Sequence, residues 1–344
     1  MRFFNFGVCA FPLNGGRLKV GVVGFGKMGM LHAGILNALP EVELGAVCEK
    51  NGLIRKFLKK ILKVPVVDDV VKLSGMDLDA VYVTTPISAH FGVVKSLYEF
   101  GVTSNIFVEK TLASSFEEAR KICELAKKFG GVNMVGYMRR FSVLFMKAKD
   151  LLDSGAIGEP LWFKAYAYSS DFFGVEGDSK VCAPQIGVVR DLGCHAIDLA
   201  LWFFGGFKVE NAEFKSVLGD GSVDSARFEV KASNGVAGEF SVSRCMDGYR
   251  MPEVGIMIQG SKGCLSVNDD TLELNFGNGS SRKWFRHDIG DNVAFWLGSP
   301  EYYREDEYFV RAVLNGGKAE PCFETAARVD GLIDEVLARA GRRE

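Results

Sequence analysis

The chain has 344 residues, which is more than one average domain, so we expect two domains. Apolar residues make up 48% and charged residues 24%, a balance typical of a soluble protein with a sizeable core. A formal net charge of −2 and the absence of an apolar run of about 18 residues predict neither a nucleic-acid partner nor a membrane partner.

Eight cysteines are scattered along the chain, without a C-x-x-C pair and mostly within apolar segments. This distribution predicts free thiols, and neither a disulfide framework nor a zinc site. The first sixteen residues lack the apolar core and the cleavage site of a signal peptide. We therefore expect a cytoplasmic protein.

The most informative stretch is residues 20–29, a buried strand that runs into G-x-G-x-x-G and then into a helix. The first glycine of this motif allows a tight turn, the second leaves room for a pyrophosphate, and the third lets the helix lie close to the strand. The start of the helix directs free N–H groups at phosphate. The residues expected to hold the cofactor here are Gly24, Phe25, Gly26, Lys27, Met28 and Gly29.

An acidic residue, Glu49, follows the second expected strand and stands about 20 residues beyond Gly29. At this place a carboxylate accepts a hydrogen bond from the ribose 2′-OH and repels a 2′-phosphate. Lys50 and Arg55 lie nearby and could accommodate that phosphate. The sequence therefore predicts NAD as the cofactor, with NADP as the alternative.

The first half of the chain alternates apolar strands with amphipathic helices, which predicts a doubly wound parallel sheet with helices on both faces. We assign residues 17–137 to this NAD(P)-binding Rossmann domain. The strands are expected at 20–23, 42–48, 64–67, 80–83, 105–108 and 132–137, and the helices at 27–39, 53–62, 89–100 and 115–129.

Ligands of an open parallel sheet bind beyond the carboxyl ends of its strands. Thr84, Thr85 and Pro86 follow the fourth expected strand, and His90 opens the next helix, so we expect all four beside the cofactor.

Glu109 and Lys110 end the fifth expected strand. A Glu-Lys pair is more often a solvated surface couple. A lysine beside an apolar run and near a nicotinamide, however, can have its pKa lowered and can exchange a proton with a reacting hydroxyl. Its position at a strand end of a nucleotide-binding sheet makes Lys110 the first catalytic candidate.

The second half of the chain changes rhythm after a helix at 143–153. We assign residues 138–344 to an α+β domain built on a largely antiparallel, open-faced sheet. Such a sheet must cover its second face, which predicts a homodimer or a homotetramer. Strands are expected at 161–168, 226–232, 236–244 and 254–259, and helices near 191–204, at 301–314 and at 324–340.

The helix near 191–204 carries Asp191, His195 and Asp198, whose spacing places them on one helix face. Asp191 could fix the tautomer of His195 and raise its basicity, which suits a base that takes a hydroxyl proton. Two other interpretations remain open: a buried structural histidine between helix-capping acids, and a metal site. His32, on the first helix, is expected in packing or on the surface.

Five segments together resemble a known pattern: G-F-G-K-M-G at 24–29, T-P-x-x-x-H at 85–90, E-K at 109–110, G-Y-M-R-R-F at 136–141 and D-x-G-x-H-x-x-D at 191–198. The chain resembles the family of glucose–fructose oxidoreductase, inositol dehydrogenase and rhizopine-catabolism proteins from about residue 18 to its end. Two departures stand out, because Thr111 replaces the usual proline after E-K and Ile87 replaces the usual asparagine after Thr-Pro.

The resemblance implies that Lys110 contacts the reacting hydroxyl and the nicotinamide ribose, and that Asp191 and His195 hold the substrate with His195 as the base. It also implies that Glu109 lies near the cofactor ribose. Residues expected near the substrate by resemblance are Met138, Arg139 and Tyr249.

The activity implied by the resemblance is an NAD(P)-dependent dehydrogenase of a secondary alcohol in a cyclic polyol, a sugar or a sugar derivative. Two alternatives remain open: an NAD-dependent glycosidase with transient redox chemistry, and a non-catalytic dinucleotide-binding regulator. The presence of Lys110, Asp191 and His195 argues against the regulator.

Overall fold

The structure is a computed structural model that describes residues 16–170, 187–217, 223–290 and 300–340. Six parallel strands form the sheet of the first domain, in the order β3-β2-β1-β4-β5-β6. The order reverses between β1 and β4, which is where such sheets bind ligands. The strands are β1 (Leu18–Val23), β2 (Val42–Cys48), β3 (Val66–Val67), β4 (Ala80–Val83), β5 (Ile106–Glu109) and β6 (Asn133–Gly136). The predicted doubly wound sheet is confirmed.

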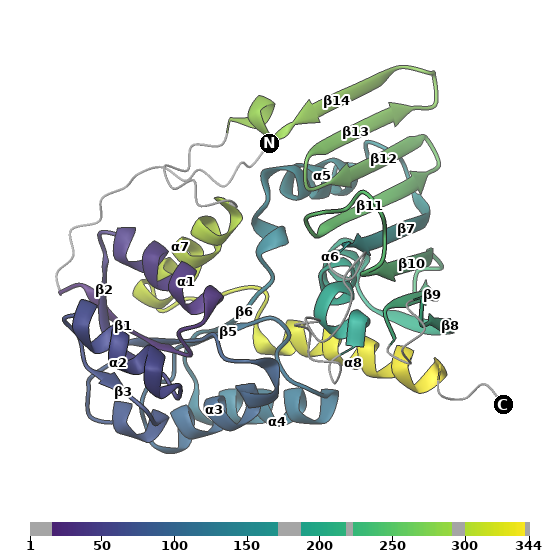
Figure 1. Ribbon diagram of the computed structural model, residues 1–344. Helices are drawn as coiled ribbons and strands as arrows, with labels where there is room; N and C mark the ends of the chain where they lie inside the picture. The colour runs from purple at the N-terminus through teal and green to yellow at the C-terminus, as the bar shows by residue number, and fades with distance from the viewer. Residues whose placement is uncertain (1–15, 171–186, 218–222, 291–299, 341–344) are drawn as a thin grey trace.

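Helices cover both faces of this sheet, with α1 on one side and α3 and α4 on the other (Figure 1). The helices of this part of the chain are α1 (Lys27–Ala38), α2 (Gly52–Ile61), α3 (Ile87–Glu99) and α4 (Phe116–Phe129), with a short 3-10 turn at Val70–Leu73. The fully buried Tyr82 and Phe107 stack beneath α1 with ring centroids 4.5 Å apart. The β-branched and aromatic strand residues therefore supply the core between the layers.

Eight strands form the second sheet, in the order β14-β13-β12-β11-β7-β10-β9-β8. β7 and β10 pair in parallel, and all other neighbours pair antiparallel, so the largely antiparallel prediction is confirmed. The strands are β7 (Pro160–Tyr168), β8 (Phe207–Lys215), β9 (Ser225–Ala232), β10 (Ala237–Ser243), β11 (Glu253–Gly260), β12 (Gly263–Asn268), β13 (Thr271–Phe276) and β14 (Ser281–Phe285).

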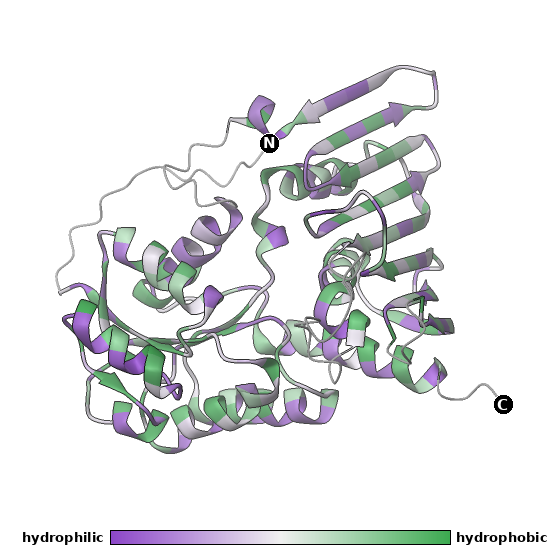
Figure 2. Cartoon of the chain, viewed as in Figure 1, coloured by the Kyte–Doolittle hydropathy of each residue, from purple (hydrophilic) through white to green (hydrophobic). Residues whose placement is uncertain are grey.

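Only one face of this sheet packs against helices of the described chain. α5 (Val143–Asp153) contacts β12 and β13, while α6 (Cys194–Phe204) contacts β7 and β11. Buried and exposed side chains alternate along the strands, as in β9, and Figure 2 shows the matching alternation of hydropathy. The sheet is therefore open-faced, as predicted.

The last two helices tie the domains together (Figure 1). α7 (Pro300–Leu314) returns to the first domain and packs on α1, where Phe309 joins the same core as Tyr82 and Phe107. α8 (Phe323–Ala340) lies between α4 and β8. α7 therefore belongs to the core of the first domain, although it follows residue 137, where we placed the end of that domain. Among the described residues, no helix is long and apolar enough to cross a membrane.

Candidate active site

The glycine loop between β1 and α1 has the geometry that its motif predicts. Gly24 has φ of +88°, and a Cβ there would lie 2.8 Å from the Thr85 side chain. A Cβ on Gly29 would lie 2.1 Å from the Gly24 carbonyl oxygen, so only glycine permits this approach of helix to strand. A Cβ on Gly26 would meet no atom within 4 Å. The space in front of Gly26 is therefore open on the side where a pyrophosphate would lie.

The amino end of α1 has free donors. Gly26 caps the helix without a side-chain hydrogen bond, and no acidic residue stands in the first turn. The first intrahelical bond from the loop runs from Met30 N–H to the Gly26 oxygen, which leaves the amides of Lys27 and Met28 for another acceptor. Free amides, the dipole and the open space together fit a dinucleotide phosphate, so the residues present suit the predicted cofactor.

Glu49 lies directly after β2, as predicted, and is almost fully buried. One carboxylate oxygen accepts the Phe25 amide at 2.7 Å, and the other accepts the Asn51 amide at 2.7 Å. Arg55 donates to the backbone oxygens of Glu49 and Lys50, both at 3.0 Å. Glu49 therefore anchors the glycine loop in addition to its predicted role at the ribose.

The four residues after β4 that were predicted beside the cofactor differ in their exposure and in their partners. Thr84 Oγ1 donates to the Gly24 oxygen at 2.6 Å and so supports the turn, while the Thr85 hydroxyl is buried without a partner among the described residues. Pro86 caps α3 and is exposed. His90 is fully buried, and its ring nitrogens lie 2.8 Å from the Thr111 oxygen and 2.9 Å from the Thr85 oxygen. With no exposed surface, His90 supports the two loops from behind, and a direct contact of His90 with the cofactor stays a prediction.

Lys110 meets Asp191 across the two domains. Its Nζ donates to the Asp191 backbone oxygen at 2.6 Å and to Oδ1 at 2.9 Å. Arg244, one residue beyond β10, binds the other carboxylate oxygen of Asp191. Asp191 is thus held between two cations, and Lys110 keeps one of its three N–H donors for a further partner.

The predicted contact between Asp191 and His195 is not formed. Residues Val189–Gly193 form a π-helical turn that runs into α6, so the four-residue spacing no longer brings the two side chains together. Asp191 faces Lys110 and Arg244 instead, and His195 Nδ1 is buried without a partner among the described residues. The expectation that Asp191 fixes the tautomer of His195 is therefore wrong.

Two pKa directions also differ from the sequence-based expectation. Burial acts to lower the pKa of Lys110, but the nearby Cys194 and Asp191 outweigh it and raise the pKa above the usual value. Burial, reinforced by the cations Arg139 and Lys110, lowers the pKa of His195 well below its usual value. At neutral pH the site therefore holds an ammonium at Lys110 and a neutral imidazole at His195.

The arginines after β6 are paired. Arg139 binds Asp269 through Nε and Nη2, both at 3.0 Å, and its Nη1 lies 3.8 Å from the sulfur of Met138. Arg140 forms a buried bidentate pair with Asp198, at 2.8 and 2.6 Å. Asp198 therefore holds α6 against η2 (Met138–Phe141) through its ion pair with Arg140. Met138 and Arg139 remain predicted substrate contacts, although most of the Arg139 donors have partners.

Tyr249 lies in the loop between β10 and β11. Its backbone oxygen accepts from the amide and hydroxyl of Ser170, at 2.7 and 2.9 Å. Its ring packs edge-on against Tyr168, with centroids 5.2 Å apart. Tyr249 and Arg244 both follow β10, and because β7 runs parallel to β10, Ser170 after β7 lies at the same edge of the sheet. Tyr249 as a substrate contact stays a prediction.

Two residues that sequence reasoning did not place at the site are Arg244 and His32. Arg244 has a sequence signal, because it is a cation at the end of an expected strand. His32 has none, since both of its partners lie far away in the chain: its ring bonds Asp306 and Glu109 inside the protein.

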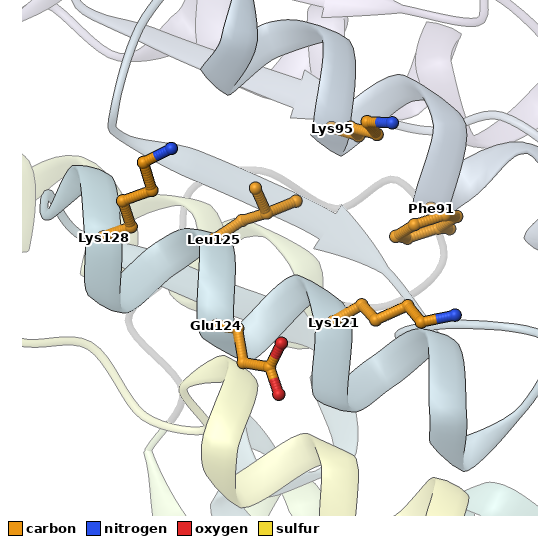
Figure 3. A pocket seen from close by; sticks show the side chains of 6 residues that line it. All are labelled: Phe91, Lys95, Lys121, Glu124, Leu125 and Lys128. Carbon is orange, nitrogen blue, oxygen red and sulfur yellow. The ribbon is translucent and has the colours of Figure 1, made fainter.

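A cavity of about 320 Å³ lies elsewhere, on the outer side of α3 and α4. Three of its six lining residues are lysines, Lys95, Lys121 and Lys128, as Figure 3 shows. None of the residues discussed above lines it, so it is separate from the candidate active site.

Two family models match the chain. A model described as an oxidoreductase family with an NAD-binding Rossmann fold matches residues 18–137, and the GFO/IDH/MocA C-terminal domain matches residues 145–266.

Similar proteins include scyllo-inositol 2-dehydrogenase (NAD(+)) of Bacillus subtilis, 28% identical over 66% of this chain and 68% of that protein. Inositol 2-dehydrogenase of Rhizobium meliloti is 25% identical over 95% of this chain and 96% of its own length. Levoglucosan dehydrogenase in complex with NADH and levoglucosan shares the fold, with a TM-score of 0.83 and 22% identity, over 95% of this chain and 98% of that chain.

Proposed function

The chain belongs to the GFO/IDH/MocA family of NAD-binding oxidoreductases, and from this premise we propose that it oxidises a secondary alcohol of a cyclic polyol, a sugar or a sugar derivative. It is an NAD-dependent enzyme, and its glycine loop, α1 and Glu49 are the parts that would hold the cofactor. The observation that carries the proposal is the contact of Lys110 with Asp191, because it joins the nucleotide domain to the second domain beside His195.

NAD held by the glycine loop would supply an acceptor for the hydride of the carbinol carbon. The hydroxyl proton of the same carbinol passes to His195, whose neutral imidazole is free to accept it. The remaining N–H of the Lys110 ammonium donates to the substrate oxygen and stabilises the negative charge that develops there. Asp191 and Arg244 fix the direction of Lys110, so the oxygen is held before the proton leaves.

The substrate class follows from the relatives named above, two of which carry inositol dehydrogenase names. The same relatives are dehydrogenases, so the glycosidase and regulator alternatives are not favoured. We expect a neutral cyclic polyol or sugar, because Arg139 and Arg140 already form bidentate pairs with the carboxylates of Asp269 and Asp198, which balance the charge that a phosphate or carboxylate would need.

The test is a panel of inositols, hexoses and sugar nucleotides, each incubated with purified protein and NAD while NADH absorbance is followed. The proposal expects NADH to accumulate with at least one cyclic polyol or sugar. Cleavage of a glycoside without net NADH would instead establish the glycosidase. Tight NAD binding with no turnover of any member would favour the regulator.

We also propose that two copies associate through the open face of the eight-stranded sheet, with a tetramer as the alternative. In support, Trp162 of β7, which lies on the same face of the sheet as Lys164, is 40% exposed. Lys164, Glu239 and Arg227 form a row of paired charges across β7, β10 and β9. An exposed aromatic side chain with polar residues around it is typical of an interface between copies.

A cytoplasmic location is proposed for the same protein. The cysteines within the described part of the chain, at 48, 123, 194, 245, 264 and 322, are all free thiols. Free thiols suit a reducing compartment.

A further inference from the structure

A buried chain of three side chains links α1, β5 and α7. His32 Nδ1 lies 2.8 and 2.9 Å from the two carboxylate oxygens of Asp306, and His32 Nε2 lies 2.9 Å from Glu109 Oε1. The side chains of His32 and Asp306 have no exposed surface. These buried contacts therefore connect His32 of the first helix with Asp306, which stands 274 positions later in the sequence.

Both ring nitrogens of His32 face carboxylates, and a neutral imidazole has only one N–H to donate. The geometry therefore favours the imidazolium. Burial alone acts to lower the pKa of His32, but attraction and hydrogen bonding by Asp306 and Glu109 outweigh burial and raise the pKa well above its usual value.

The other titratable groups packed around His32 do not supply a further charge. Tyr82 of β4 and Tyr302 of α7 pack against the ring, with centroids 5.5 and 5.9 Å away, and burial raises the pKa of both phenols. Glu305 of α7 is fully buried, and neither of its oxygens has a partner among the described residues. Burial and the neighbouring Glu109 and Asp306 raise the pKa of Glu305 well above its usual value, which favours the neutral acid.

Glu109 connects the buried side chains of His32 and Asp306 to the active site. While Oε1 accepts from His32, Oε2 accepts the backbone N–H of Lys110 at 3.0 Å. Both oxygens of Glu109 are therefore used inside the protein, whereas the family resemblance implied a contact with the cofactor ribose. The carboxylate holds the backbone from which the catalytic lysine extends.

We propose that His32 and Asp306 are positioning residues, which fix the end of β5 through Glu109 and so place Lys110 for contact with the substrate oxygen. This inference rests on the proposed function. Under this proposal α7, which lies near the end of the chain, completes the part of the active site that the nucleotide domain supplies.

The test is Asp306→Asn, which keeps the shape of the side chain but removes the charge that holds the His32 proton. Proton NMR would follow the four histidines of the chain as a function of pH, with the His32 signal assigned by its loss in His32→Gln. In Asp306→Asn we expect His32 to titrate at lower pH than in the wild type. Above that pH kcat should fall about 10- to 100-fold, because a misplaced catalytic group costs about that much, and it should recover as the pH is lowered. The KM for NAD should change less than about twofold.

Phe309→Leu is the matched control, because Phe309 packs α7 against Tyr82 and Phe107 and has no polar side-chain atom that could bond His32, Asp306 or Glu109. It should lower thermal stability without adding a pH transition to kcat. A shifted His32 titration with unchanged kcat in Asp306→Asn would overturn the positioning role while leaving the proposed function intact. A pH-dependent fall of kcat in Phe309→Leu would also overturn the positioning role. If the wild type oxidises no member of the panel, the proposed function fails, and an unshifted His32 titration would then separately refute the charged chain.

Discussion

Lys110 and Asp191, which stand 81 positions apart, meet at the boundary between the two domains, with Nζ 2.9 Å from Oδ1. Lys110 follows the last residue of β5, and Asp191 lies in the π-helical turn before α6. Any change in the angle between the domains would alter this contact. The position of the candidate catalytic lysine therefore depends on both domains.

The open space in front of Gly26 predicts the effect of Gly26→Val. A valine side chain there would occupy the volume expected for the pyrophosphate, so NAD binding should be lost while the protein remains folded. Gly34→Val, at an exposed site on the same helix that also has open space, is the matched control. Calorimetric titration with NAD checks both variants, and unchanged affinity in a folded Gly26→Val protein would remove the cofactor assignment.

Glu49→Gln should weaken NAD binding and shift the preference towards NADP, because the charge that repels a 2′-phosphate is lost. The amide oxygen can still accept one of the two backbone N–H groups that Glu49 holds, so part of the loop anchor remains. Glu43→Gln, at an exposed position on β2, the strand that Glu49 follows, serves as the control. The ratio of the dissociation constants for NAD and NADP is the readout, and a constant ratio would exclude Glu49 as the ribose ligand.

The pH dependence of kcat/KM follows from the two pKa directions. The pKa of His195 is lowered well below 6.5, so the imidazole stays neutral as the pH falls through neutrality and is protonated only in clearly acidic solution. The pKa of Lys110 is raised above 10.5, so its ammonium persists through mildly alkaline pH. We therefore expect a flat profile around neutrality, with an acid limb well below pH 6.5.

Arg139→Gln should move this acid limb towards higher pH, because Arg139 is one of the cations that lower the pKa of His195. A wild-type transition near neutrality, or an acid limb that stays in place in Arg139→Gln, would argue against His195 as the titrating base.

The proposed dimer can be tested on the open sheet face. Light scattering at micromolar concentration should give at least the mass of two chains, and Trp162→Asp should shift the protein towards monomer because it places a charge among exposed apolar side chains. Lys318→Asp, at an exposed residue in the turn between α7 and α8, is the control. A wild-type protein that is only monomeric would contradict the proposal.

Much of the fold could be predicted because its signals are local. Alternating apolar strands and helices predicted the parallel sheet, and the glycines at 24 and 29 predicted the loop whose backbone geometry requires them, while Gly26 leaves the space in front of the loop open. Residues directly after strands were predicted at the site for the same reason, since all parallel strands end at one edge.

The parts that could not be predicted depend on partners distant in sequence. The pKa direction at Lys110 is set by residues of the second domain, and Arg244 reaches Asp191 across 53 positions. His32 was expected in packing or on the surface, because Asp306 and Glu109 are not visible from its own helix. The contact predicted between Asp191 and His195 is wrong for another reason. The prediction assumed a regular α-helix, whereas the turn that carries Asp191 is π-helical.

The central claim is that Lys110 and His195 act together on a substrate hydroxyl across the domain boundary. The most direct measurement is kcat for Lys110→Ala and His195→Ala with the substrate that the panel yields, alongside the dissociation constant for NAD. Lys95→Ala, in the outer cavity, and His287→Ala, whose side chain is 80% exposed, are the matched controls. We predict that each active-site variant loses about 10²- to 10⁴-fold in kcat while NAD affinity is largely kept, and that both controls behave as wild type. Near-wild-type turnover in both active-site variants would contradict the account.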